Sequence, residues 1–240
     1  MSHIEENLIY VGEKIAKAAE RSGRNTDEVH LVAVSKTFDA GYVKEAVKAG
    51  QSLFGENRVQ EARDKVPLVD EGAQWHMIGR LQKNKAKYIP GLFDMVHSVD
   101  SLELAQSLND AMEKALERGK ELKSDLLPVL VQVNIAEEEQ KGGTKESETA
   151  DLVKKISFLP RLKVKGLMII PPFSDNPENS RPYYKKLKEM RDSIDAMNIP
   201  NVEMTHLSMG MSGDYEVAVE EGATFVRVGS AIFGKRDYLE

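Results

Sequence analysis

The sequence predicts an α/β fold: a single (β/α)8 barrel of the TIM type that occupies residues 1–240 and carries an extra N-terminal helix. Three observations support this prediction. Short apolar runs and helical patterns alternate eight times from residue 29 onward, which is typical of a parallel sheet. The length of 240 residues is close to the roughly 250 that a closed eight-stranded barrel needs. No linker-like stretch divides the chain.

The first predicted element is a helix that precedes every strand. Ser2 and Glu5 have the spacing of a capping box, apolar residues recur at helical spacing, and Gly23 follows the expected end. Asp100 and Glu103 have the same capping spacing before a later helix. The strands are expected at 29–35, 52–55, 74–79, 94–99, 126–134, 164–170, 202–208 and 224–229. The helices are expected at 39–50, 56–66, 82–89, 100–119, 146–159, 176–197 and 212–222, and the closing residues complete the eighth unit.

Composition narrows the functional classes. The chain has no cysteine, which removes disulfides, thiolate metal ligands and cysteine nucleophiles. The net charge of -6 argues against nucleic acid or an anionic membrane as the main partner. The N-terminus lacks the basic and apolar segments of a signal peptide, and no apolar run could span a bilayer. We therefore expect a cytoplasmic protein.

The segment HLVAVSK, residues 30–36, ends an apolar run with a lysine. Barrel enzymes carry their sites at the carboxyl ends of the strands, and Lys36 follows the first predicted strand. It shares strand parity with Val32 and Val34, so it points inward if the valines do. Loss of water there disfavours an ammonium group and favours an amine that can condense with an aldehyde. The alternative is a lysine that extends to solvent from a strand end.

Two segments near the C-terminus, THLSMGMSGDYE and TFVRVGSAIFG, each run from a strand end through glycine and serine. Backbone N–H groups there, with the hydroxyls of Ser208, Ser212 or Ser230, would bind an anion. The loops after strands seven and eight commonly bind phosphate in this fold. The alternative is ordinary helix capping, with Ser212 as the N-cap.

Arg227 lies between two valines of the last predicted strand, where a guanidinium needs an acid or a polar ligand atom. A structural ion pair with a barrel glutamate is one explanation. The other combines Arg227 with Lys36 and the serine loops around one ligand, pyridoxal 5'-phosphate (PLP). Its aldehyde would meet Lys36, its phosphate the loops and its ring nitrogen Arg227.

The sequence resembles the pyridoxal phosphate homeostasis protein family, relatives of the alanine racemase N-terminal barrel. The resemblance covers nearly the whole chain, through AVSKTF (33–38), FGENRVQEA (54–62), WHMIGRLQKNK (75–85), GLMIIP (166–171), LSMGMSGDYEVAV (207–219) and TFVRVGSAIFG (224–234). It implies a barrel of PLP fold type III in which Lys36 forms the internal aldimine and Arg227 faces the pyridine nitrogen. It also implies that the phosphate lies among Ser208, Gly210, Gly229 and Ser230. By the same resemblance, the residues near the cofactor include Asn57, Met168 and Met211.

The resemblance implies a non-catalytic PLP-binding protein of vitamin B6 homeostasis, which limits free PLP and could supply it to apoenzymes. An arginine at the pyridine nitrogen disfavours its protonation, so the ring becomes a poor electron sink. Alanine racemase also takes an acid/base tyrosine from an additional β-domain, which we do not expect here. We expect no nucleic-acid or membrane partner, and a monomer or weak homodimer.

Other functions remain open at this stage. Lys36 could serve a PLP-dependent amino-acid racemase or transaminase of low activity, or a cofactor-free Schiff-base aldolase. Metal-dependent hydrolysis would recruit His76, His97 and His206, but their spacing matches no metal motif, so hydrogen-bonding histidines are the simpler interpretation.

Three further segments have a functional and a plain interpretation. The charged loop 136–146 would be a lid or a solvated loop. The basic stretch QKNKAK, residues 82–87, would attract an anion or begin a solvated helix. Asn57 would reach the cofactor or cap the next helix.

Overall fold

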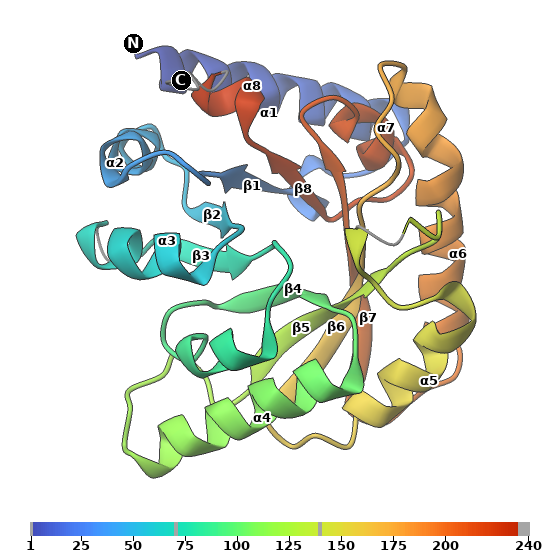
Figure 1. The fold of residues 1–240 in the computed structure, drawn as a ribbon. Helices are drawn as coiled ribbons and strands as arrows, with labels where there is room; N and C mark the ends of the chain where they lie inside the picture. Colours follow the sequence, from blue (N-terminus) through green and yellow to red (C-terminus); the bar gives the residue numbers. More distant parts are fainter. Residues whose placement is uncertain (1, 70–71, 139–140, 235–240) are drawn as a thin grey trace.

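The computed structural model describes residues 2–69, 72–138 and 141–234, and it confirms the predicted barrel. Within these ranges, parallel strands close in the order β1 to β8, with β8 paired to β1 (Figure 1). The strands are β1 His30–Val34, β2 Leu53–Glu56, β3 Gln74–Met77, β4 Met95–Val99, β5 Leu127–Val133, β6 Leu162–Ile169, β7 Val202–Met211 and β8 Phe225–Val228.

Helices surround the barrel, as the alternating pattern predicts (Figure 1). The α-helices are α1 His3–Arg21, α2 Ala40–Lys48, α3 Val59–Lys65, α4 Leu102–Glu117, α5 Glu146–Ile156, α6 Arg181–Asp195, α7 Tyr215–Glu220 and α8 Ser230–Phe233. Short 3-10 helices are η1 Thr26–Glu28, η2 Val66–Leu68, η3 Lys83–Tyr88 and η5 Pro177–Ser180. None of the described helices has the length and apolarity needed to cross a bilayer.

The extra N-terminal helix is present as α1 and packs against α7 and α8. The predicted capping box at its start is confirmed, because the Ser2 hydroxyl accepts the Glu5 N–H and the Glu5 carboxylate accepts the Ser2 N–H. The capping prediction for α4 is wrong by one residue. Its N-cap is Ser101, whose hydroxyl accepts the Leu104 N–H, because the helix begins one residue later than the Asp100 spacing predicts.

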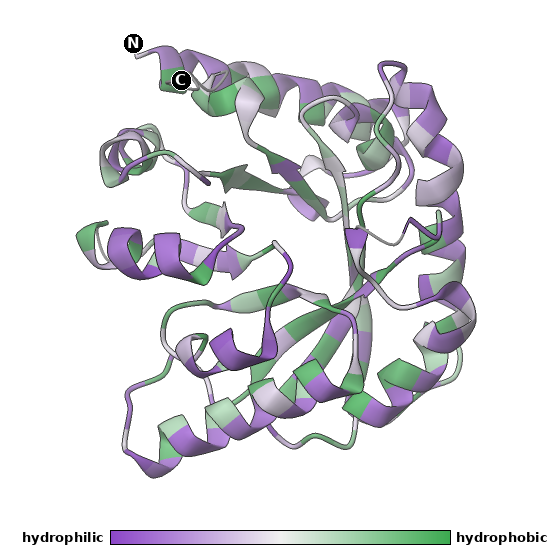
Figure 2. Cartoon of the chain, in the orientation of Figure 1, coloured by the Kyte–Doolittle hydropathy of each residue, from purple (hydrophilic) through white to green (hydrophobic). Residues whose placement is uncertain are grey.

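Apolar residues form a core on each side of the sheet, and Figure 2 shows hydrophobic colouring along the strands and on the helices around them. The larger core lies between strands and helices. The smaller core fills the barrel interior and consists of Val32, Val34, Leu53, Ile78, Met95, Leu130, Met168 and Phe225. Because Val32 and Val34 point inward, the alternation of the strand carries Lys36 to the inner side as it leaves the barrel.

Candidate functional site

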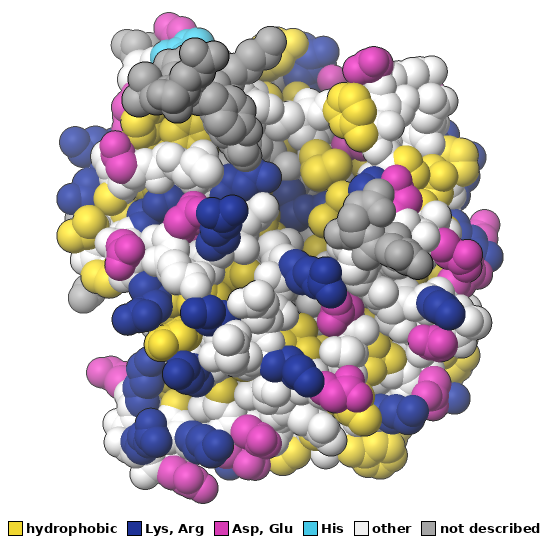
Figure 3. Space-filling model, in the orientation of Figure 1, with side chains coloured by type: hydrophobic (Ala, Val, Ile, Leu, Met, Phe, Trp, Pro, Cys, Tyr) yellow, Lys and Arg dark blue, Asp and Glu magenta, His cyan; other side chains and the backbone are white. Residues whose placement is uncertain are grey.

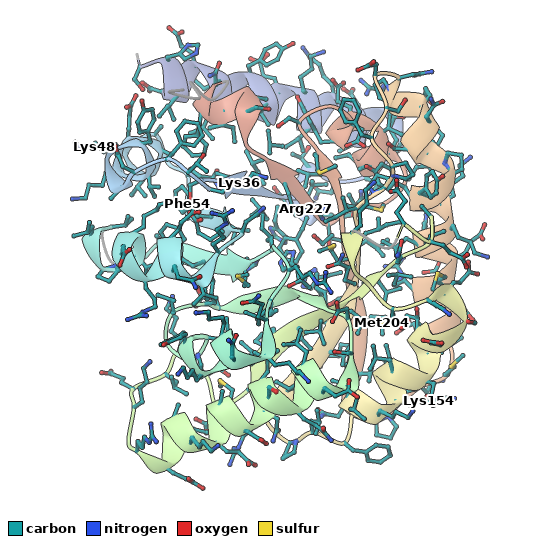
Figure 4. All side chains as sticks on the ribbon, in the orientation of Figure 1. Lys36, Lys48, Phe54, Lys154, Met204 and Arg227 are labelled. Atoms are coloured by element: carbon teal, nitrogen blue, oxygen red, sulfur yellow. The ribbon has the colours of Figure 1, made fainter. Side chains whose placement is uncertain are left out.

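A cavity of about 640 Å³ opens at the carboxyl end of the barrel. Lys36 reaches it from the end of β1, and Arg227 reaches it from the neighbouring β8; both are labelled near the centre of Figure 4. Lys36 is half-buried, and Thr37 after it has a φ of 70°. This left-handed conformation is uncommon for a β-branched residue. It is fixed by the Thr37 N–H, which donates to the Glu61 carboxylate at 2.9 Å.

A buried polar network supports Lys36 from the helix side of the sheet. One oxygen of Glu56 accepts the Ser35 hydroxyl at 2.7 Å and the Lys65 ammonium at 2.5 Å. Lys65 also donates to the Ser35 carbonyl at 2.7 Å. Burial raises the pKa of Glu56, although the contacts with Lys65 and Ser35 oppose the rise. These bonds hold the backbone immediately before Lys36.

The loops after β7 and β8 form another part of the cavity wall, and the second of them lies beside β1. The Ser212 hydroxyl accepts the Gly229 N–H at 3.2 Å, which joins the two loops. Asp214 pins the first loop, since its carboxylate accepts the Met211 N–H at 2.7 Å and the Tyr184 hydroxyl at 2.7 Å. The N-cap of α7 is Asp214, so the alternative that Ser212 caps this helix is wrong.

Gly229 brings β8 close to β1. A Cβ at this position would lie 3.1 Å from the Val34 carbonyl oxygen and 3.3 Å from the Val34 Cβ. A larger residue would push the second loop away from β1, so glycine keeps the wall of the cavity near the strand that carries Lys36.

Arg227 is buried at the base of the cavity with 5% of its surface exposed. One guanidinium nitrogen, Nη1, donates to the Ser208 hydroxyl at 2.6 Å, and Nη2 donates to the Ile169 carbonyl at 2.8 Å. Burial lowers the pKa of Arg227 to about 10. Within the described residues Arg227 makes no ion pair, so the predicted alternative of a barrel glutamate partner is not what the structure contains.

The structure brings six of the nine predicted cofactor residues to the cavity wall: Lys36, Asn57, Met211, Arg227, Gly229 and Ser230. The other three lie behind it. Met168 is fully buried in the barrel core, and Ser208 is fully buried beneath Arg227. Gly210, at φ 90°, packs against α7, where a Cβ would lie 2.6 Å from that of Ala218.

The wall also contains Ser212, whose hydroxyl was one of the candidates predicted for the anion site. The remaining wall residues are outside the predicted set: Val34, Phe38, Ile78, Gly79, Arg80, Lys141, Ile170, Pro172, Phe173, Ser174, Gly213, Asp214 and Gly234. The strand parity that predicts an inward Lys36 applies equally to Val34, which precedes it by two residues. Arg80 lies in one of the motifs, but nothing in its spacing indicates a position on the wall. Asn57 does not cap α3, whose N-cap Arg58 makes no side-chain capping bond.

Two predictions concern neighbouring loops. Lys141, in the 136–146 loop, lines the cavity and donates to the Pro171 carbonyl at 2.8 Å. Residues 139 and 140 lie outside the described residues, and closure of this loop as a lid stays a prediction. The QKNKAK stretch forms η3, beside a second groove of about 960 Å³ that shares Asn57 and Arg80 with the cavity. Figure 3 shows Lys and Arg side chains gathered on the side where α3 lies.

Three histidines of the barrel, His76, His97 and His206, hydrogen-bond to one another or to hydroxyls. His97 contacts Ser208 and His76, and His206 contacts the Thr224 hydroxyl. In the described part of the chain, no group of three or more His, Asp or Glu side chains could hold a metal ion. The contacts with Ser208, His76 and Thr224 support the hydrogen-bonding interpretation of these histidines.

Comparison with known proteins identifies the class first. The family described as "Alanine racemase, N-terminal domain" matches residues 11–237. An alanine racemase structure from Corynebacterium glutamicum shares the fold, with a TM-score of 0.68 at 14% identity, over 99% of this chain and 63% of that one.

Two more similar proteins define the group within this class. The pyridoxal phosphate homeostasis protein of Aquifex aeolicus is 44% identical over 97% of this chain and 98% of its own. The structure of PipY from Synechococcus elongatus with PLP bound has 34% identity and a TM-score of 0.77, over 92% of this chain and 100% of that one. The chain belongs to the pyridoxal phosphate homeostasis protein family, a branch of the alanine racemase N-terminal domain family.

Proposed function

We propose that this protein binds PLP through Lys36 in the cytoplasm, limits the free cofactor and passes it to apoenzymes. The observation that carries the proposal is that one cavity is lined by Lys36, by Arg227 and by the two loops that contain Ser212 and Ser230. PipY, whose structure was solved with PLP bound, is similar over nearly its whole length. The Aquifex relative is named for pyridoxal phosphate homeostasis.

The residues present fit this cofactor. A volume of about 640 Å³ lies within the range of about 300–1,000 Å³ that small-molecule sites occupy. The cavity offers a primary amine at Lys36 for an aldehyde and a guanidinium at Arg227 for a ring nitrogen. The Ser230 hydroxyl, which has no bond within the described residues, is a donor for a phosphate. We propose Lys36, Asn57, Met211, Arg227, Gly229 and Ser230 as contacts, and Met168, Ser208 and Gly210 as supports behind them.

The same geometry favours binding over catalysis. Bound PLP supplies an electron sink for carbanions, and this sink is strongest when the ring nitrogen is protonated. Arg227 has only N–H donors, and its cation disfavours a second positive charge beside it. Beside Arg227 the ring nitrogen would therefore stay unprotonated and accept a hydrogen bond from the guanidinium.

A racemase also needs a second acid or base across the site. The described wall contains no tyrosine or histidine. Its other acid/base side chains besides Lys36 are engaged, since Asp214 accepts from three donors and Lys141 donates to the Pro171 carbonyl.

The test is an absorption spectrum of the purified protein with PLP, before and after borohydride, followed by mass analysis of the Lys36 peptide. We expect a visible band that borohydride converts into a stable adduct on Lys36. Lys36→Ala should lose both. The matched control is Lys48→Ala, because Lys48 is exposed on α2 and lies away from the cavity (Figure 4). Absence of the band in the unmodified protein, or an adduct on another lysine, would refute the proposal.

Two further measurements separate holding from turnover. Protein loaded with PLP should restore the activity of a PLP-dependent apoenzyme when a phosphatase destroys free PLP. Incubation with amino acids in deuterated water should give no exchange of the α-proton above that of free PLP. Exchange that depends on Lys36 would instead establish a weak racemase or transaminase. Condensation of the PLP-free protein with a sugar carbonyl would establish the aldolase.

A further inference from the structure

A continuous chain of hydrogen bonds runs from the base of the cavity into the barrel. Arg227 Nη1 donates to Ser208 Oγ at 2.6 Å, and Ser208 Oγ lies 2.8 Å from His97 Nδ1. His97 Nε2 then lies 2.9 Å from His76 Nδ1. The four side chains come from β8, β7, β4 and β3, and each is at most 5% exposed. This chain of hydrogen bonds therefore links four strands, and water does not reach the side chains at its centre.

The hydrogen bonds in this chain have one direction. A guanidinium can only donate, so the Ser208 oxygen accepts from Arg227. The Ser208 hydroxyl must then donate its own hydrogen. Among the described residues, the remaining partner of this oxygen is His97 Nδ1, which consequently accepts. The reverse arrangement, with His97 donating to Ser208, would leave a fully buried hydroxyl hydrogen without an acceptor, which is costly.

This direction fixes the tautomers of both histidines. Burial lowers the pKa of His97 well below its usual value and lowers the pKa of His76 to about 4, so both rings are neutral near pH 7. A neutral ring that accepts at Nδ1 carries its hydrogen at Nε2. His97 Nε2–H therefore donates to His76 Nδ1, and His76 also carries its hydrogen at Nε2. The Nδ1 lone pairs of His97 and His76 both face the Arg227 end of the chain of hydrogen bonds. The positive charge of a buried guanidinium favours this orientation.

We propose that Arg227, Ser208, His97 and His76 form a hydrogen-bond relay, in which each group donates to the next in this order and both histidines are held as Nε2–H tautomers. In this relay His97 is a positioning residue for the Arg227 guanidinium. The relay occupies Arg227 Nη1, and the Ile169 carbonyl occupies Nη2. These two bonds fix the guanidinium plane, and its other N–H groups are left for the cavity. That these N–H groups meet the ring nitrogen of PLP rests on the proposed function, whereas the hydrogen-bond directions and the tautomers do not.

The tautomer assignment is tested on the ligand-free protein. Long-range ¹H–¹⁵N correlation spectra of ¹⁵N-histidine-labelled protein at pH 7 distinguish protonated from bare ring nitrogens. We expect a bare Nδ1 and a protonated Nε2 for His97 and for His76. An Nδ1–H tautomer of His97, or a charged ring at either position, would overturn the relay. Since this spectrum uses neither PLP nor a variant, it stands even if Lys36 proves not to bind the cofactor.

Variants test the positioning role. His97→Asn keeps an acceptor near the Nδ1 position, whereas His97→Leu removes it. The Arg227 side-chain N–H signals should stay protected from solvent exchange in His97→Asn and lose protection in His97→Leu. The matched control is Thr224→Val, which removes hydroxyl contacts with His206 and with the Leu207 backbone, both outside the relay. PLP affinity should fall roughly tenfold in His97→Leu and recover largely in His97→Asn. Equal protection in both His97 variants would refute the positioning role, even if both lose affinity.

Discussion

Replacing Lys65 by methionine should destabilise the protein strongly, because the substitution isolates a buried carboxylate. Glu56 is fully buried and Lys65 is 6% exposed. Lys65 makes two of the three hydrogen bonds among Glu56, Lys65 and Ser35. The second oxygen of Glu56 has no partner within the described part of the chain. After Lys65→Met, only the Ser35 hydroxyl would solvate the carboxylate.

The magnitude follows from the burial. Removing one partner of a buried ion pair costs about 3–5 kcal/mol, since the remaining charge is left without compensation. For a chain of this length, 1 kcal/mol corresponds to roughly 2–4 °C in Tm, so the expected decrease is roughly 6–20 °C. Burial already raises the pKa of Glu56, so the folded state binds its proton more tightly than the unfolded state. The cost should therefore grow as the pH rises and shrink as the carboxylate becomes protonated in acid.

Urea denaturation at pH 5 and pH 8 measures this cost. The matched control is Lys155→Met, which breaks an exposed ion pair with Asp151 and should leave the midpoint nearly unchanged. Adding Glu56→Leu to Lys65→Met should recover a large part of the loss, because no buried charge then remains. A loss below 1 kcal/mol in Lys65→Met at pH 8, or no recovery in the double variant, would refute the reasoning.

Three other predictions test the site and its support. Gly210→Ala should lower Tm measurably in a thermal melt, because its φ is 90° and its Cβ would lie 2.6 Å from that of Ala218; an unchanged Tm would count against the close packing. Ser212→Ala should weaken PLP binding about 2- to 10-fold in a spectral titration, because the Gly229 N–H loses its acceptor and the two loops separate. Equal affinity would argue against a role for this contact. Burial lowers the pKa of His76 to about 4, from an unfolded value of about 6.5. The folded state therefore gains about 3 kcal/mol of stability from a neutral His76, and this gain is complete above pH 6.5 and disappears as the pH falls through 4. His76→Asn should flatten this part of the urea-midpoint profile, and an identical profile would contradict it.

The barrel and the position of Lys36 were predictable because they depend on periodicity. Alternating apolar runs identify the strands, and the parity of Val32 and Val34 determines the direction of Lys36. Ser208 was not placed correctly by the same reasoning. The predicted strand ended at residue 208, whereas β7 continues to Met211 through a shifted register and a left-handed Gly210. Ser208 consequently lies inside the barrel, and the loop of the cavity wall begins later, near Ser212.

The partners of buried polar groups were the least predictable part of the site. Glu56 and Lys65 are nine residues apart, and their pairing depends on how α3 packs on β2. His97 and Ser208 are 111 residues apart, and only closure of the barrel brings them together. Residue type indicates that such groups need partners, but it cannot select the partner among distant strands.

The two buried networks support the two ends of the proposed ligand from different sides of the sheet. The Glu56 network lies outside the barrel and holds the backbone before Lys36. The relay lies inside the barrel and holds Arg227. An apolar core of the same shape would be equally stable or more stable, because each buried polar group loses hydration. Their presence is explained if orientation of the amine and the guanidinium matters more than stability. A variant that replaces Ser35, Glu56 and Lys65 by apolar residues should therefore keep its Tm while Lys36 reacts more slowly with PLP. If the rate were unchanged, the Glu56 network would have no role in orienting Lys36.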